Sequence, residues 1–213
     1  ENHYLLKMAL YSELKMDLEV LPIYEILVQH YPKKRYWTNL SGLYGQRDRQ
    51  MDQMAALEAA YDDRLLDKQR EFTALSQLLF MFENPRKAAR VIENGLNQGI
   101  VKQEEKTLKA AAQYWHAAQE LEKAKPYYKK AAIKSKEGEL YIFLGQVHFS
   151  LDEFNDAEEA IKQGIKKGKL KDEAAAYMLL GQNEKRSHQE YKRDDETDAQ
   201  QSRIGPPSTP QLQ

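Results

Sequence analysis

The side chains that could do chemistry are few, and the histidines come first because histidine both binds metals and moves protons near neutral pH. No two of them form an HExxH pair, the spacing that places two zinc ligands and a general base on one helix face. The sequence has no cysteine, which excludes disulfides, thiol chemistry and cysteine-ligated zinc. We therefore expect no metal site and no cofactor, and we interpret the histidines as residues of a helix core or groove. They are His3, His30, His116, His148 and His188.

The stretch GIKKGKL at residues 164–170 and two pairs of acids are the remaining candidates for phosphate binding or catalysis. A P-loop needs four residues between its glycines, followed by Lys and then Ser or Thr. Residues 164–170 have three such residues and no hydroxyl, so we interpret them as a helix end whose cations complement the helix dipole. The pairs Asp62–Asp63 and Asp194–Asp195 have no partnered base. Because no set of nucleophile, base and oxyanion donor is present, the sequence predicts a protein that is not an enzyme.

A row of basic side chains and a row of amide side chains could instead bind a peptide. Gln pairs with the backbone amides of an extended segment, and Arg or Lys pairs with acidic side chains or a C-terminus. The alternative is a solvated helix face, on which Arg, Lys and Gln are common because they favour helix. The predicted groove residues are Arg35, Asn39, Arg70, Gln77, Lys106, Gln113 and Gln146.

These side chains recur because the sequence repeats itself. Setting each aromatic or apolar opener to the fourth position of a unit places the unit starts at 1, 34, 69, 105, 138 and 174. Small residues such as Ser41, Ala112, Gly145 and Gly181 fall at the eighth position, where two helices can approach closely. Pro32 ends the first unit, since the residue before a proline resists continuing a helix. The pattern resembles the tetratricopeptide repeat, which implies an all-α fold: a right-handed superhelix, or α-solenoid, of about five to six helical hairpins.

Two prolines disturb the second helix of this pattern. Pro22 and Pro126 both fall at the twenty-second position of their units. A proline inside a helix costs about 3 kcal/mol. We expect these helices either to start late or to bend at the proline.

Bulk composition limits the partners and the extent of the array. The net charge is −1, without the basic excess of a nucleic-acid-binding protein, and no apolar run reaches the length of a membrane span. Residues 1–182 are expected to form the array, and residues 183–213, which are polar and rich in Pro, Ser and Gln at their end, a largely disordered tail. The chain begins at Glu1, so we expect a processed chain or a piece of a longer one, with any targeting segment missing.

Three stretches carry a narrower resemblance: HYPKKRYWTNLSGLYG at 30–45, AARVIENGLNQG at 88–99 and KKAAIKSKEGELYIFLGQ at 129–146. They are similar to the repeat protein that accompanies some bacterial TonB–ExbB–ExbD energy-transduction systems. The resemblance covers about residues 1–182. It implies a periplasmic, non-enzymatic scaffold that supports iron uptake by contact with components such as TonB, ExbB or ExbD.

A cytoplasmic adaptor that binds peptides, of the co-chaperone type, stays open as the alternative, and so does a homo-oligomer. One variety can be tested by residue type. Chaperone-binding arrays of this class hold a C-terminal carboxylate with Lys, Asn and basic residues at five places, which here read Leu5, Ala9, Asn39, Arg70 and Ala74. Two of the five match, so the sequence does not support binding of a chaperone tail.

Overall fold

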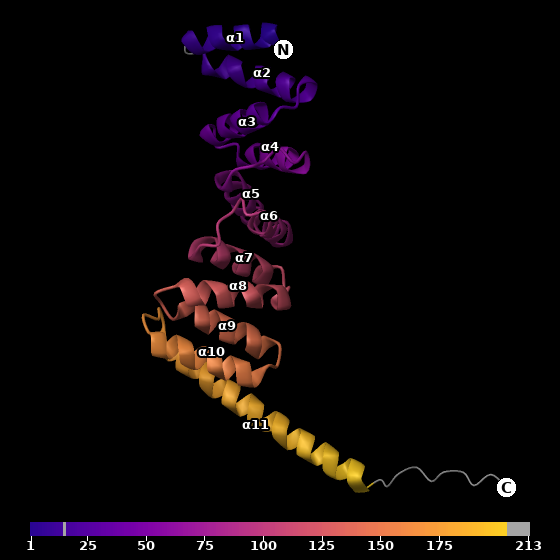
Figure 1. Ribbon diagram of the computed structural model, residues 1–213, viewed down its shortest axis with the longest axis vertical. Coiled ribbons are helices and arrows are strands. Elements are labelled where there is room, and N and C mark those ends of the chain that lie inside the picture. Colours follow the sequence, from indigo (N-terminus) through magenta and orange to yellow (C-terminus); the bar gives the residue numbers. More distant parts are fainter. Residues whose placement is uncertain (15, 204–213) are drawn as a thin grey trace, which may run out of the picture. The chain divides into compact units, whose positions relative to one another are not determined.

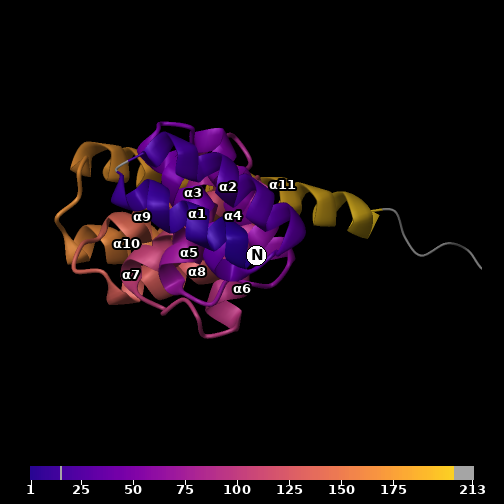
Figure 2. The same ribbon diagram turned by 90° about the horizontal axis from the view of Figure 1, so that it is seen from above.

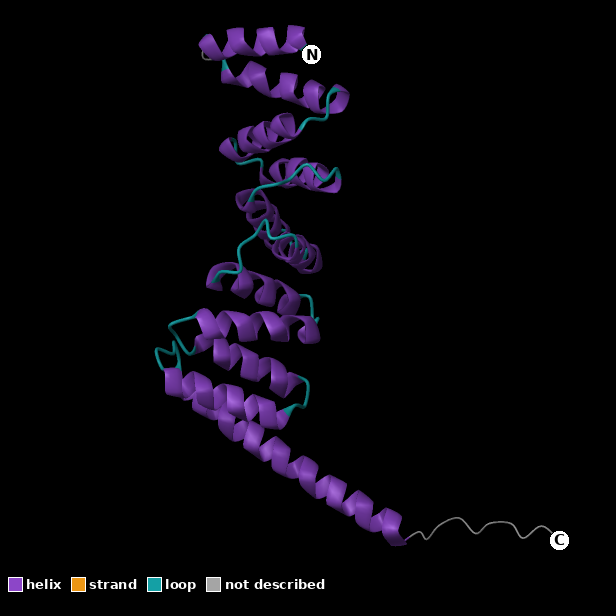
Figure 3. Ribbon diagram, in the orientation of Figure 1, coloured by secondary structure: helices purple, strands orange, loops and turns teal. Residues whose placement is uncertain are grey.

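The structure of the chain is a computed structural model. Its described residues form α-helices joined by turns and loops. The described residues are 1–14 and 16–203, with the side chains of 17, 18 and 194–203 outside the description. They form eleven helices and no strand (Figures 1 and 3), so the predicted all-α fold of helical hairpins is confirmed. The helices are α1 (Asn2–Glu13), α2 (Asp17–His30), α3 (Lys34–Gln46), α4 (Gln50–Asp62), α5 (Gln69–Met81), α6 (Pro85–Asn97), α7 (Glu105–Ala117), α8 (Leu121–Lys134), α9 (Glu139–Ser150), α10 (Phe154–Lys167) and α11 (Glu173–Arg203).

The helices belong to two compact units, Glu1–Glu120 and Leu121–Gln213. In the first unit each of α1 to α7 packs against the next helix along the chain, and in the second unit α8 to α11 do the same. Contacts between consecutive helices are local in sequence, which is the organisation of a repeat solenoid. None of the helices among the described residues is long and apolar enough to cross a membrane.

Within a hairpin the two helices approach closely because the first helix carries a small residue at the eighth position. Ser41 of α3 and Ser76 of α5 are buried there. At Gly145 of α9 an added Cβ atom would lie 2.5 Å from the side chain of Ile161 on α10. A larger side chain would force α9 and α10 apart, which explains why glycine stands at this position.

The turn inside a hairpin has one backbone conformation in the four hairpins from α3–α4 to α9–α10. Its residue at the fifteenth position of the unit lies in the left-handed region, which favours glycine and tolerates Asp and Asn. The residues are Asp48 (φ 55°), Glu83 (φ 59°), Gln119 (φ 59°) and Asp152 (φ 58°). The chain therefore makes a sharp turn there without a single glycine.

The unit starts expected from the sequence lie within one residue of the first residues of α1, α3, α5, α7, α9 and α11. The second helices α2, α4, α6, α8 and α10 all begin at the seventeenth position of their units, so the expected late start at the prolines is wrong. Pro22 and Pro126 lie inside α2 and α8. Each proline is the sixth residue of its helix, beyond the first four N–H groups that have no partner within a helix, so each helix lacks one internal hydrogen bond there.

The predicted tail begins inside α11, which extends past α10 as one helix in both views (Figures 1 and 2). Residues 183–203 belong to α11, whereas residues 204–213 lie outside the described residues, so the predicted disordered tail stays a prediction. The side chain of Asn183 is fully buried and its Nδ2 donates a 2.8 Å hydrogen bond to the carbonyl of Phe154. This anchor, and the Glu, Lys, Arg and Gln residues that follow, favour helix over coil. The expected extent of the array, residues 1–182, stays a prediction.

Candidate functional site

Arg35, a predicted groove residue, already forms an ion pair and a hydrogen bond within the compact unit Glu1–Glu120. Its guanidinium lies 2.9 Å from a carboxylate oxygen of Glu1 and also donates to the Tyr36 hydroxyl. Hydrogen bonds from Lys33 and Tyr36, together with the one from Arg35, lower the pKa of Glu1 to about 2. The arrangement ties the start of α1 to the start of α3, so Arg35 stabilises the packing of these two helices.

Asn39 faces a cleft of about 400 Å³ that residues of α2 and α3 line. Its Nδ2 donates a 2.9 Å hydrogen bond to the Tyr24 hydroxyl, which leaves its carbonyl oxygen to accept another. Among the predicted groove residues of the first unit, Asn39 is the one that the structure places at a cleft together with an apolar wall, formed by Val20 and Leu43.

The remaining predicted groove residues lie on three helices. Arg70 and Gln77 are exposed on α5, Lys106 is exposed and Gln113 half-buried on α7, and Gln146 is exposed on α9 of the second unit. That these side chains hold one bound peptide stays a prediction.

The second unit has a larger cleft, of about 540 Å³, that α8, α9 and α10 line together. We call it the α8–α10 cleft. Lys125 and Lys129 come from α8, while Asp156 and Glu159 come from α10, so the two outer helices bring opposite charges. The helix between them, α9, contributes apolar, aromatic and imidazole groups. The lining residues are Lys125, Pro126, Lys129, Ile133, Tyr141, Leu144, His148, Asp156, Glu159, Ala160 and Gln163.

An ion-pair network fixes one end of the α8–α10 cleft. The Lys125 ammonium lies 2.8 Å from Glu122 and 2.6 Å from Glu153, and the other carboxylate oxygen of Glu153 lies 2.5 Å from Nδ1 of His148. The hydrogen bond from Lys125 is the largest cause that lowers the pKa of Glu153. Burial opposes this shift, and the hydrogen bond from His148 adds to it. Burial opposes the charge on Lys125, yet its hydrogen bonds with Glu122 and Glu153 raise its pKa.

His148, Glu153 and Asp156 bring nitrogen and oxygen atoms within 4.8 Å of one another, a spacing that a metal ion could use. The ammonium of Lys125 already compensates the Glu153 carboxylate from 2.6 Å. A divalent cation here would have to displace or oppose that ammonium. The arrangement therefore works as an ion-pair network that holds the α9–α10 turn, and the expected absence of a metal stays a prediction.

The other end of the cleft is apolar. Ile133 is 63% exposed although it is a bulky aliphatic residue, and the half-buried Tyr141 lies in the same lining. The Lys167 ammonium lies 5.3 Å from the centre of the Tyr141 ring and donates a 2.8 Å hydrogen bond to the Ala132 carbonyl. An exposed aliphatic side chain beside an aromatic ring, with charges on both sides, is a surface that a protein segment can cover.

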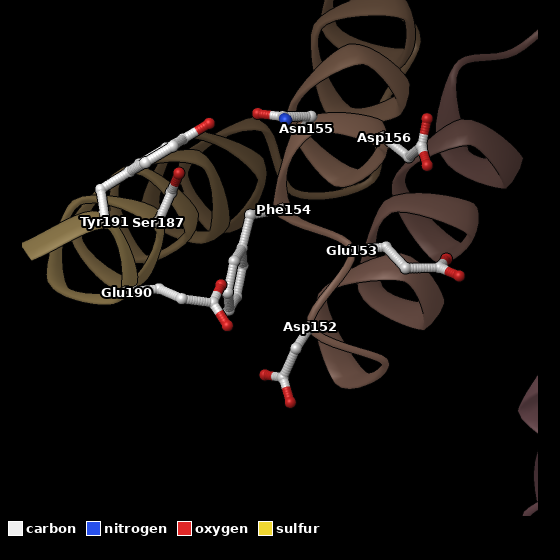
Figure 4. A pocket seen from close by; sticks show the side chains of 8 residues that line it. All are labelled: Asp152, Glu153, Phe154, Asn155, Asp156, Ser187, Glu190 and Tyr191. Atoms are coloured by element: carbon white, nitrogen blue, oxygen red, sulfur yellow. The ribbon is translucent and has the colours of Figure 1, made fainter. Parts of the chain in front are cut away.

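A smaller cleft of about 310 Å³ lies between the start of α10 and α11 (Figure 4). Glu190 points toward the ring of Phe154 across this cleft, whereas Glu153 and Asp156 point away from α11. Arg186 of α11 lies 3.2 Å from Asp152 and 6.0 Å from the centre of the Phe154 ring. These contacts attach α11 to the preceding hairpin, so this cleft belongs to the packing of the unit.

Solved structures similar to this chain share one kind of fold. A crystal structure of YrrB, described as a TPR protein with an unusual peptide-binding site, aligns with a TM-score of 0.56 at 12% identity over 85% of this chain and 90% of its own. A structure of MamA aligns with a TM-score of 0.57 at 15% identity over 82% and 94% of the two chains. MamA from Desulfovibrio magneticus, residue 41 to its end, aligns with a TM-score of 0.50 at 12% identity over 78% and 93%.

The fold is that of the tetratricopeptide-repeat proteins. At these identities the likeness establishes the fold alone. No protein-family model and no curated protein matches the chain.

The tetratricopeptide frame places the α8–α10 cleft away from the residues predicted to bind. The predicted groove uses the second and ninth positions of the first helices, with Asn39 at the sixth position. The cleft uses the fourth, seventh and eleventh positions of α9, namely Tyr141, Leu144 and His148. The sequence left His148 open between a helix core and a groove. One feature of the sequence could have indicated the cleft: His148 stands where three other units have Tyr44, Leu79 and Trp115. In the structure His148 is only partly buried.

Proposed function

We propose that this chain is a protein–protein interaction module that binds a segment of a partner protein in the α8–α10 cleft. The observation that carries the proposal is the lining of this cleft. The exposed Ile133 shares this lining with Tyr141, with Lys129 from α8 and with Asp156 and Glu159 from α10. Such a surface suits a segment with one bulky apolar residue between charges of both signs.

We further propose that the partner is a component of a TonB–ExbB–ExbD type energy-transduction system and that the chain works in the periplasm. Support comes from the stretches at 30–45, 88–99 and 129–146, which resemble the repeat protein of such systems. Four of the residues that line the cleft lie inside the third stretch, namely Lys129, Ile133, Tyr141 and Leu144. The chain would then act as a scaffold for iron uptake.

A pull-down from solubilised envelopes of cells that carry TonB, ExbB and ExbD tests the proposal. The wild-type chain should recover at least one motor component, and Lys129→Glu combined with Ile133→Asp should lose it. Lys130→Glu, a matched charge change one residue away and outside the cleft lining, should keep it. Recovery of no motor component by the wild type, or equal recovery by the cleft variant, contradicts the proposal.

Two further measurements separate the alternatives. If Arg70→Glu with Lys106→Glu abolishes partner binding while the cleft variant does not, the predicted groove is the binding surface instead. Cell fractionation decides the compartment: a chain recovered from the periplasm with a processed N-terminus agrees with the proposal, and an unprocessed cytoplasmic chain favours the cytoplasmic adaptor.

A further inference from the structure

In a hairpin of this chain the second helix covers a defined face of the first helix. Among the described residues, no helix covers the equivalent face of α11. In the hairpin of α9 and α10, the covered face of α9 carries Gly138, Ile142, Gly145 and Phe149. All four lie against α10, and Gly138 approaches the Gly164 carbonyl so closely that a Cβ atom there would lie 2.0 Å from it. A Cβ atom on Gly145 would meet Ile161, Ile142 lies against Gly164, and the rings of Phe149 and Phe154 lie 6.0 Å apart.

The same positions of α11, counted from the unit starts at 138 and 174, carry Ala174, Met178, Gly181 and Lys185. All four are exposed. The contrast is sharpest at the glycines: a Cβ atom on Gly145 would lie 2.5 Å from Ile161, whereas one on Gly181 would have no atom within 4 Å. The helix α11 packs on α10 with another face, which buries Ala176 and Asn183.

The uncovered face is apolar at its centre. Met178 is 66% exposed and the neighbouring Tyr177 is 54% exposed, beside Ala174 and the bare backbone of Gly181. A helix face of a repeat array that nothing covers is ordinarily polar, and no helix among the described residues covers this face of α11. Toward its end α11 follows that rule, but its first turns keep the composition of a helix that receives a partner helix.

The packing of α10 on α9 shows which kind of helix would fit this face. At the contact with α9, α10 presents Ala157, Ile161 and Gly164, a small residue, an aliphatic residue four positions later and a glycine three positions after that. On the receiving side the change in polarity is at one position, where Lys185 of α11 replaces Phe149 of α9. An acidic residue in the first turn of the incoming helix would therefore pair with Lys185, and it would also favour the helix through the helix dipole.

We propose that this face of α11, formed by Ala174, Tyr177, Met178, Gly181 and Lys185, binds an amphipathic α-helix of a partner protein. The partner helix has an aliphatic residue against Gly181, a small residue one turn before it and an acidic residue beside Lys185. This surface is separate from the α8–α10 cleft. The exposed stripe of α1 in a second copy of this chain does not have that pattern, because Leu6, Leu10 and Leu14 are all bulky.

The test uses a helical peptide of known sequence in place of the partner. The probe is a fluorescent peptide with the sequence of residues 153–168, in which Phe154 is replaced by glutamate and a hydrocarbon staple on the outer side maintains the helix. Binding to the full chain is measured by fluorescence anisotropy. The wild-type chain should bind the probe, and a probe with Ala157→Leu should bind at least tenfold more weakly.

Gly181→Leu is the decisive variant, because a side chain there meets nothing in the free protein and fills the place of the incoming helix. It should weaken probe binding at least tenfold while leaving the melting temperature unchanged or higher. Gly42→Leu is the matched control, since Gly42 is a helical glycine whose Cβ position is also open, on α3 of the other unit. It should bind the probe as the wild type does.

Absence of probe binding, or equal binding by wild type and Gly181→Leu, overturns the proposal. So does a sedimentation experiment in which the wild-type chain alone self-associates and Gly181→Leu does not, because the occupant would then be a second copy. Lys129→Glu with Ile133→Asp should leave probe binding unchanged. Failure of the α8–α10 cleft and failure of the α11 face are thereby distinguished.

Discussion

Glu71 holds the start of α5 with a carboxylate that is only 6% exposed. It accepts hydrogen bonds of 3.1 Å from the backbone N–H groups of Asp67 and Lys68, and its ion pair with Lys34 measures 2.9 Å. The side chain therefore satisfies helix-start donors and ties α5 to α3 within the first unit.

We predict that Glu71→Ala destabilises the chain by about 1–3 kcal/mol, because buried donors and the Lys34 ammonium lose their acceptor. Glu71→Gln, which keeps an acceptor oxygen but loses the charge, should cost less. The free energy of unfolding from urea titrations measures both. Equal stability of wild type and Glu71→Ala would show that Glu71 has no such role.

Glu153 gives the ion-pair network a pH dependence. Its pKa is lowered from 4.5, chiefly by the hydrogen bond from Lys125. A carboxyl with a lowered folded-state pKa stabilises the folded state above its unfolded-state pKa, and this contribution is lost as the pH falls through the folded-state value.

We therefore predict that the difference in unfolding free energy between wild type and Glu153→Gln is largest near neutral pH and shrinks as the pH falls below about 4.5. The measurement is a series of urea titrations of the two proteins across pH 3 to 7. A difference that stays constant over this range contradicts the assigned pairing with Lys125.

At the scale of the helix, the two matched glycines test the packing of hairpins. Gly145→Ala should destabilise the chain by about 1–3 kcal/mol, because its Cβ atom would overlap Ile161 of α10. Gly181→Ala should stabilise it by up to about 1 kcal/mol, since alanine favours helix and no atom lies within reach. Thermal unfolding followed by circular dichroism reports both. Equal effects of the two changes would mean that α11 is covered like α9.

The turn between the helices of a hairpin allows a gain in stability. Glu83 has φ of 59°, a conformation that costs most residues about 1–2 kcal/mol and glycine almost nothing. After the entropy that glycine adds to the unfolded chain, Glu83→Gly should stabilise by about 0.5 kcal/mol. Asp48→Gly at the equivalent turn should gain less, because aspartate tolerates this conformation. A loss of stability in Glu83→Gly would contradict the assigned turn.

At the scale of the molecule, the repeat spacing was sufficient to predict the helices. Small residues such as Ser41 and Gly145 fix where two helices approach, and that contact depends on side-chain size, which a sequence displays directly. The Glu83 and Gln119 turns were not predictable, because glutamate and glutamine do not favour the left-handed conformation that the turn requires.

The site was less predictable than the fold. Whether Tyr141 or His148 lies in a core or a cleft depends on how far neighbouring helices cover it, and residue type does not encode that coverage. Likewise the helical part of the predicted tail depends on Asn183, a polar residue whose side chain is buried and bonded to the Phe154 carbonyl. Binding surfaces on repeat folds arise from such incomplete coverage.

Photo-cross-linking in the native cell envelope tests the central claim most directly. A photoreactive amino acid at Ile133, in the α8–α10 cleft, is compared with the same amino acid at Lys130, on the same helix outside the cleft lining. The account predicts adducts from position 133 that contain TonB, ExbB or ExbD by mass spectrometry, with none from position 130. Adducts with no motor component, or the same adducts from both positions, would contradict it.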